Sequence, residues 1–284
     1  PSTAAFVGEL ARLVERVHAG SQLRLTGYNL ETGIQATVPA EITQRGSLVL
    51  SARLFGEIIR RLPDDVVSVT AEGSNVHIVC GPTSFDILSS SAEEFPELPT
   101  VDRGGSFTVT QGVLHSMISR VIFAVSDNES RPIHTGALFE LNEDLLTMVA
   151  VDGYRLALRR EKILSASTPL MSFVVPGAAL NEVDKICSDS DEPVTVTEGD
   201  RHVLFQLGPT TLVARRLEGE FLNYRQTIPQ NNAVVLEAET SALQQSIDRA
   251  SLIINEKLKS PLRCRFEDGL LSITSRTAIG AAFD

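Results

Sequence analysis

The feature that most constrains this chain is an internal repeat with a period of about 126 residues. From Leu48 an apolar stretch runs into a helix-like pattern, and the segment from Phe173 repeats both features 125 residues later. A Glu-Gly turn follows at Glu72 and again at Glu198, in each case between two apolar stretches. The offset stays between 125 and 127 residues through two further landmarks, which are Gly81-Pro82 with Gly208-Pro209 and Glu94-Phe95 with Glu220-Phe221.

A third copy begins near the C-terminal end. The helical spacing of Leu114 and Ile118 recurs 129 residues later, and a weaker version of it starts at Val7. The turn Glu267-Asp268-Gly269 predicts a β-hairpin over 263–274. We therefore expect three related α+β units, at 1–103, 104–231 and 232–284, the last of them incomplete.

The units differ in length. The first is about twenty residues short ahead of a strand at Leu23–Leu25, where the second unit has residues 128–144 with a predicted strand at Gly136–Leu141. The third unit breaks off after about fifty residues. Either the chain is a fragment or stretches are missing from the numbering. For the first unit we favour missing residues, because a sheet tolerates the loss of an interior strand poorly.

Composition and charge limit the class of protein. The chain is 43% apolar and 21% charged, which is typical of a globular protein, and it has no apolar run long enough for a membrane span. Three separated cysteines without a CxxC pair indicate neither a disulfide framework nor a paired-cysteine zinc site, so we expect a cytoplasmic setting. The net charge of -11 argues against a coat of nucleic acid, unless basic residues gather on one face.

Metal, cofactor and enzyme motifs are absent from the sequence. The five histidines have no metal-ligand spacing, and there is no phosphate-binding glycine loop and no GxSxG motif. We therefore expect no metal and no cofactor. A hydrolase with an acidic active site between domains remains the alternative, although catalytic residues would break the internal symmetry that the repeat keeps.

Residues 131–158, RPIHTGALFELNEDLLTMVAVDGYRLAL, carry the clearest resemblance to a known family. Further matches follow in order at 219–225 (GEFLNYR) and 255–257 (NEK). Together they resemble the bacterial DNA polymerase III beta subunit, the beta sliding clamp. The resemblance implies repeated DNA-clamp domains, three per subunit, in a head-to-tail homodimer whose helices line a ring and whose antiparallel sheets lie outside.

The implied function is that of a processivity factor in DNA replication, without catalytic residues of its own. Such a clamp encircles duplex DNA without reading its sequence. It tethers the DNA polymerase III alpha subunit, the clamp loader and other proteins that carry a clamp-binding motif. A clamp-like fragment that cannot close, because its third domain is incomplete, is a further possibility.

Basic residues on the ring-lining helices would reconcile the acidic total with DNA binding, since they hold phosphates rather than bases. Asn128 matches a DNA-contacting position of the family. For any one arginine, an ordinary solvated helix face remains the alternative. The implied DNA-facing residues are Arg12 and Arg16, one helical turn apart, with Arg60, Arg61, Arg120, Asn128, Lys185 and Arg249.

The resemblance also implies a pocket between the second and third domains that receives partner peptides through apolar anchors. The alternative for Asp152-Gly153-Tyr154 is a plain hairpin turn. Departures from the family pattern, at Val151, Tyr154, Leu222 and Leu258, keep the site apolar but change its detail. The implied pocket residues are His134, Val151, Gly153, Tyr154, Arg155, Leu156, Leu222, Gln226, Thr227 and Leu258.

Overall fold

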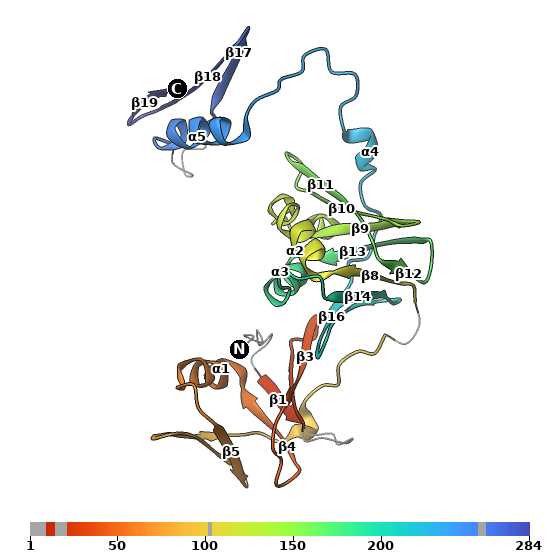
Figure 1. Cartoon of the computed structure of the whole chain (residues 1–284), viewed down its shortest axis with the longest axis vertical. Helices are drawn as coiled ribbons and strands as arrows, with labels where there is room; N and C mark the ends of the chain where they lie inside the picture. Colours follow the sequence, from red (N-terminus) through yellow and green to blue (C-terminus); the bar gives the residue numbers. More distant parts are fainter. Residues whose placement is uncertain (1–9, 15–21, 102–103, 255–259) are drawn as a thin grey trace. The chain divides into compact units, whose positions relative to one another are not determined.

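Residues 10–14, 22–101, 104–254 and 260–284 are described by a computed structural model of the chain. The chain divides into two compact units, Pro1–Tyr224 and Arg225–Asp284. Each unit contains helices and antiparallel sheet (Figure 1). None of the described helices is long and apolar enough to cross a membrane.

Strands and one longer helix make up the described part of residues 10–94. Ser51 ends the strand that begins near Leu48, and its hydroxyl caps the following helix by accepting from the Leu54 amide, so the predicted strand-to-helix junction is confirmed. The elements are β1 (Leu10–Val14), β2 (Gln22–Tyr28), β3 (Thr32–Pro39), β4 (Ser47–Ser51), α1 (Ala52–Arg61), β5 (Val67–Glu72), β6 (Asn75–Cys80), β7 (Thr83–Leu88) and the short η1 (Ala92–Glu94).

Residues 106–215 repeat much of this plan and contain the two helices α2 and α3. The predicted helices around Leu114 and after Phe173 are both present, as is the strand at Gly136. The elements are β8 (Ser106–Thr110), α2 (Gln111–Ser119), η2 (Ile122–Ala124), η3 (Pro132–Thr135), β9 (Gly136–Asn142), β10 (Leu145–Val151), β11 (Leu156–Lys162), β12 (Ser165–Ala166), β13 (Leu170–Pro176), α3 (Gly177–Ile186), β14 (Pro193–Glu198), β15 (His202–Leu207) and β16 (Thr210–Arg215).

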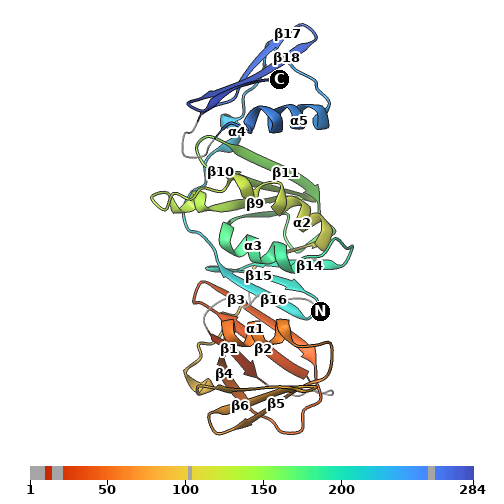
Figure 2. The ribbon, with the colours of Figure 1, turned by 90° about the vertical axis from the view of Figure 1, so that its left-hand side faces the viewer.

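Three antiparallel sheets organise unit Pro1–Tyr224 (Figure 2). The largest has the order β12-β8-β14-β15-β16-β3-β2-β1-β4, and the others are β11-β10-β9-β13 and β5-β6-β7. Strands β16 and β3 pair from Thr210 opposite Ala36 to Ala214 opposite Thr32, so one sheet runs through both copies of the repeat.

The main core of this unit lies where the two larger sheets and the helices α2 and α3 meet. Alternate side chains of each strand point inward, and the ring of Phe139 from β9 meets the ring of Phe205 from β15 at 6.3 Å, edge to face. Helix α2 contributes Leu114 and α3 contributes Leu180, and all four side chains are fully buried. Each such side chain stabilises the fold by about 1.5–3 kcal/mol.

The prediction of a helix from Val7 onward is wrong for Leu10–Val14. These residues form strand β1, which lies between β2 and β4. In the order β4-β1-β2-β3, this strand takes the place that β9 takes in β13-β9-β10-β11. Pairing with neighbouring strands therefore overrides the helical spacing, because Ala11–Val14 are paired with a strand on both edges and Leu10 is paired with β4. Residues 7–9 and 15–16 lie outside the described residues.

Unit Arg225–Asp284 has a helix and one small sheet of order β17-β18-β19. The predicted hairpin around Glu267-Asp268-Gly269 is confirmed, with Gly269 at a φ of 69° in its turn. Its elements are α5 (Thr240–Ser251), β17 (Arg263–Glu267), β18 (Leu270–Thr277) and β19 (Gly280–Phe283), and the short α4 (Tyr224–Thr227) spans the boundary.

Candidate functional site

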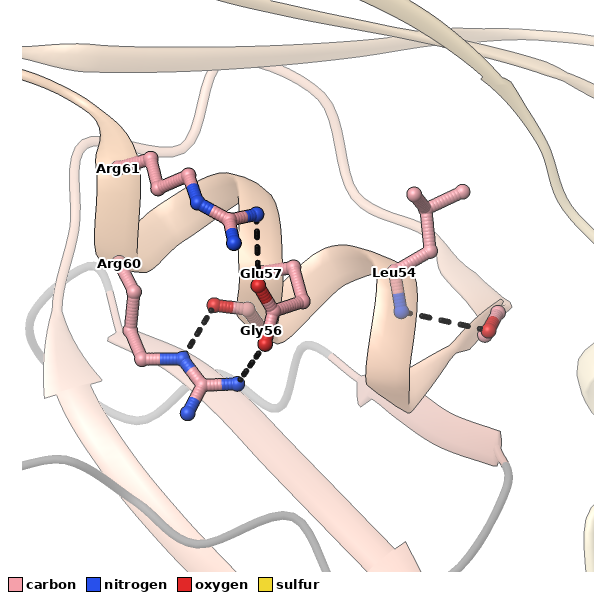
Figure 3. Close-up of polar contacts among 6 residues, drawn as sticks. Leu54, Gly56, Glu57, Arg60 and Arg61 are labelled. Atoms are coloured by element: carbon pink, nitrogen blue, oxygen red, sulfur yellow. Dashed lines mark hydrogen bonds and ion pairs between the residues drawn. The ribbon is translucent and has the colours of Figure 1, made fainter.

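Two of the implied DNA-facing residues occupy the last turn of α1 and share one carboxylate (Figure 3). Arg60 Nη2 lies 2.8 Å from Glu57 Oε1, and Arg61 Nη1 lies 2.6 Å from Glu57 Oε2. Arg60 Nε also donates to the carbonyl of Gly56 at 3.2 Å. The side chains of Arg60 and Arg61 are 59% and 76% exposed, so both cations remain open to a ligand.

The equivalent turn of α3 has the same pairing. Lys185 stands 125 residues after Arg60, and its Nζ lies 2.7 Å from Glu182 Oε1. On α5, Arg249 donates from Nη2 to Asp284 at 2.9 Å. The C-cap of α2, Arg120, is exposed, and no ion pair of it is recorded among the described residues.

The remaining DNA-facing candidates are placed differently from expectation. Arg12 lies in strand β1 rather than on a helix with Arg16, which corrects the expected one-turn pair. Arg16 itself lies outside the described residues. Asn128 is exposed in the loop after η2, where its side-chain oxygen accepts from the Ser130 amide at 3.0 Å.

The charge of the helices is uneven. Helix α1 carries three arginines and one glutamate, whereas α3 carries Glu182 and Asp184 against the single cation Lys185. Asp184 also lies 2.8 Å from the imidazole of His115 on α2. A positive surface is therefore concentrated on α1, and α3 presents its cation among acids.

The β10–β11 hairpin presents the centre of the implied peptide pocket. Asp152 Oδ1 accepts from the amides of Tyr154 at 2.9 Å and Arg155 at 2.8 Å, and Oδ2 accepts from Arg155 Nε at 2.8 Å. The two amides, followed by the guanidinium, lower the pKa of Asp152 to about 2. The turn is thus held by a carboxylate that is charged at neutral pH, a role that the sequence did not assign to Asp152.

Side chains around this turn are open to a ligand. Tyr154 is fully exposed, and a Cβ on Gly153 would meet no atom within 4 Å. Arg155 lies over the ring of Phe123 at 5.9 Å, and Phe123 itself is 56% exposed. Phe123, the central residue of η2, was not identified from the sequence as part of this surface.

His134 forms a second part of the implied pocket. Its ring meets the ring of Phe221 edge to face at 5.9 Å, directly before Leu222 in the chain. The carbonyl of His134 accepts from the Ser126 amide at 2.9 Å, and this bond holds η3 against the loop after η2. Leu222 is 39% exposed.

The structure brings together only part of the expected set. Val151 is 4% exposed, so its side chain packs in the fold rather than facing a ligand, while Leu156 is half-buried at the start of β11. Gln226 and Thr227 are exposed on α4 in unit Arg225–Asp284. Leu258 lies outside the described residues. Within the described ranges, no group of three or more histidine, cysteine, aspartate or glutamate side chains is arranged to hold a metal.

Comparisons with family models, curated proteins and solved structures all identify similarity to the same family. Family models of the DNA polymerase III beta subunit match this chain, the central domain over residues 108–223 and the N-terminal domain over residues 14–99. The beta sliding clamp of Staphylococcus epidermidis is 31% identical over 264 residues, which cover 90% of this chain and 70% of that protein. The beta sliding clamp of Halalkalibacterium halodurans is 29% identical over 265 residues, which cover 89% and 70%. The crystal structure of the DNA polymerase sliding clamp from Bacillus subtilis superposes with a TM-score of 0.88 at 28% identity, and covers 97% of this chain and 75% of that one.

Proposed function

Because the chain belongs to the family of the bacterial DNA polymerase III beta subunit, we propose that its helix cations face duplex DNA and that its β10–β11 turn receives partner peptides. The chain functions as a DNA sliding clamp in replication, a processivity factor rather than a catalyst. It has repeated clamp domains, and it covers 74% and 75% of the length of two solved clamp chains. The hydrolase alternative has no support in the comparisons.

The family implies DNA and polymerase or other clamp-binding proteins as partners. We propose more specifically that the DNA polymerase III alpha subunit and the clamp loader bind this chain, that it assembles head to tail as a homodimer, and that it works in the cytoplasm. We also propose clamp domains at 1–103, 104–231 and 232–284. The period of the repeat and the ranges matched by the two family models, 14–99 and 108–223, support this division.

The proposal for DNA rests on exposure and repetition. Arg60 and Lys185 occupy equivalent positions of two helices, and both side chains are more than half exposed. Arg120 and Arg249 form a second equivalent pair, at the ends of α2 and α5. Cations repeated on equivalent helices suit a ligand whose charge repeats along its axis, as the phosphates of a duplex do.

The proposal for peptides rests on the turn held by Asp152. Three hydrogen bonds fix the backbone of the turn, so the main chain at Gly153 and Tyr154 is presented at a smaller ordering cost on binding. An apolar peptide side chain would pack on Tyr154 and Phe123, and the polar rim would come from Arg155. Leu222 supplies an exposed apolar surface after Phe221.

The test is fluorescence polarisation of a labelled peptide of the Gln-Leu-x-Leu-Phe type on the full chain, comparing wild type with Gly153→Asp. A carboxylate placed on this turn should weaken apolar packing by at least about tenfold, because it must be desolvated. Gly73→Asp is the matched control, since Gly73 occupies another hairpin turn at positive φ with nothing within 4 Å of an added Cβ. Equal binding by wild type and Gly153→Asp, or equal loss in both variants, would contradict the assignment.

A further inference from the structure

Four of the proposed DNA-facing cations are bound to a carboxylate of their own unit rather than left free. Each ion pair is exposed at its cationic end, with 56–76% of the basic side chain open to solvent. The pairs are Arg60 and Arg61 with Glu57, Lys185 with Glu182, and Arg249 with Asp284.

The α1 pairing holds Arg60 back against its own helix. Its Nη2 is bound to Glu57 and its Nε donates to the Gly56 carbonyl, so the guanidinium lies along α1 (Figure 3). A guanidinium bound in this way offers a phosphate fewer of its five donors. Glu57 therefore determines both the direction of Arg60 and the net charge that α1 presents.

The repeat preserves the arrangement. Glu57 and Arg60 are three residues apart, and so are Glu182 and Lys185, each 125 residues further on. The cation changes from arginine to lysine while the pair stays. Exposed pairs at this spacing contribute little to stability, so their main physical effect is on the charge offered to an approaching anion.

We propose that Glu57 and Glu182 are positioning residues that act as internal counterions: they hold Arg60, Arg61 and Lys185 retracted and lower the affinity of the helices for duplex DNA. This inference rests on the proposed DNA-facing role of those cations. A carboxylate within 3 Å of each cation competes with a phosphate and repels it.

The experiment measures binding of a short fluorescein-labelled duplex to the full chain by fluorescence anisotropy, over a series of salt concentrations. Glu57→Gln should tighten binding by about two- to fivefold, the size of one exposed charge interaction. It should also steepen the slope of log affinity against log salt, by up to about 0.9 for each cation released to the DNA. Glu182→Gln should act in the same direction through Lys185.

Glu72→Gln is the matched control. Glu72 ends β5 in a hairpin, is exposed, and has no ion pair recorded among the described residues. The substitution changes the net charge of the chain as Glu57→Gln does, so an equal gain in both variants would overturn the inference. Circular dichroism confirms that α1 is retained in each variant.

A double-mutant cycle separates this inference from the proposed function. In a chain with Arg60→Gln and Arg61→Gln, Glu57→Gln should tighten binding no more than the control Glu72→Gln does, because no paired cation is left to release. If the arginine changes weaken binding but Glu57→Gln alone leaves affinity and salt slope unchanged, the counterion role is refuted and the DNA-facing role stands. If the arginine changes also leave binding unchanged, both are refuted.

Discussion

The phenolic oxygen of Tyr224 donates a hydrogen bond to Oε2 of Glu140 at 2.7 Å, which joins the segment after β16 to an interior strand of the four-stranded sheet. Tyr224 is 2% exposed, and its amide donates to the carbonyl of Leu222 at 2.7 Å. The exposed Leu222 is therefore held by a buried residue two positions later. The motif GEFLNY (219–224) therefore ends in a tyrosine that attaches this segment to the sheet, which the sequence alone does not show.

Tyr224→Phe should lower the free energy of unfolding by about 1–3 kcal/mol, because the hydroxyl serves a charged acceptor in a part-buried place. Urea unfolding measures the change. Tyr154→Phe is the control for stability, since Tyr154 is fully exposed and should change it by less than about 0.5 kcal/mol. An equal effect of the two substitutions would show that the bond to Glu140 contributes nothing to stability.

The lowered pKa of Asp152 leads us to expect that its contribution to stability decreases as the pH falls. Its folded pKa is about 2, below its value of about 3.9 in an unfolded chain. A depressed pKa contributes stability that is present above about pH 4 and is lost as the pH falls through about 2. The stability difference between wild type and Asp152→Asn should therefore be constant from pH 7 to about pH 5 and shrink below about pH 4.

Denaturant unfolding of wild type and Asp152→Asn at a series of pH values tests this. The amides of Tyr154 and Arg155, which donate to Asp152, should shift in NMR spectra over the same pH range. A difference in stability that grows as the pH falls would be the wrong sign, and would mean that the carboxylate is not held in its charged form.

The elements of the repeat were predictable because their signals are local. Glu72-Gly73 and Glu198-Gly199 mark hairpin turns, and apolar residues at a period of 2 or 3.6 mark the strands and helices around them. Segment Leu10–Val14 was not predictable in this way. Its spacing suits a helix, but its structure depends on pairing with β2 and β4, both of which follow it in the chain.

The candidate sites show the same division. The hairpin turn at Gly153 could be located from the sequence, and so could the cations of α1. Polar contacts decide what these residues present. The spacing of Glu57 from Arg60 and Arg61 permits ion pairs on a helix, but the sequence does not show that one carboxylate binds both arginines, nor that Asp152 binds two backbone amides. Residue types in the sequence thus located the candidate surfaces. The contacts that each side chain makes could be identified only from the structure.

We expect that replacing the buried side-chain amide of Gln111 lowers the stability of the fold substantially. Gln111 is 6% exposed at the start of α2, where its Oε1 accepts from the amide of Ser188 at 3.0 Å and from its hydroxyl at 2.9 Å. Its Nε2 donates to Glu192 at 3.3 Å. Gln111→Leu leaves the Ser188 amide without this acceptor, and should lower the free energy of unfolding by about 2–4 kcal/mol.

Thermal or urea unfolding gives the measurement, and Gln206→Leu is the control. Gln206 is exposed on β15, so the same substitution there should change the stability by less than about 0.5 kcal/mol. A small loss for Gln111→Leu would show that water replaces the amide at the junction of α2 and the loop before β14.

Gly136 opens β9 and begins the Gly-x-Leu-Phe-Glu stretch, and the structure indicates why no larger residue fits. Its φ of -136° is ordinary extended backbone, so conformational freedom is not the reason. An added Cβ would lie 2.3 Å from the carbonyl oxygen of Val175 and 2.8 Å from the side chain of Leu217. Gly136→Ala should therefore push β9 from β13 and lower the free energy of unfolding by about 1–3 kcal/mol.

Gly46→Ala is the control, because nothing lies within 4 Å of a Cβ added there, and it should change the free energy of unfolding by less than about 0.5 kcal/mol. Equal stability of the two variants in urea would mean that the strands move apart without cost, and that close packing does not explain the glycine.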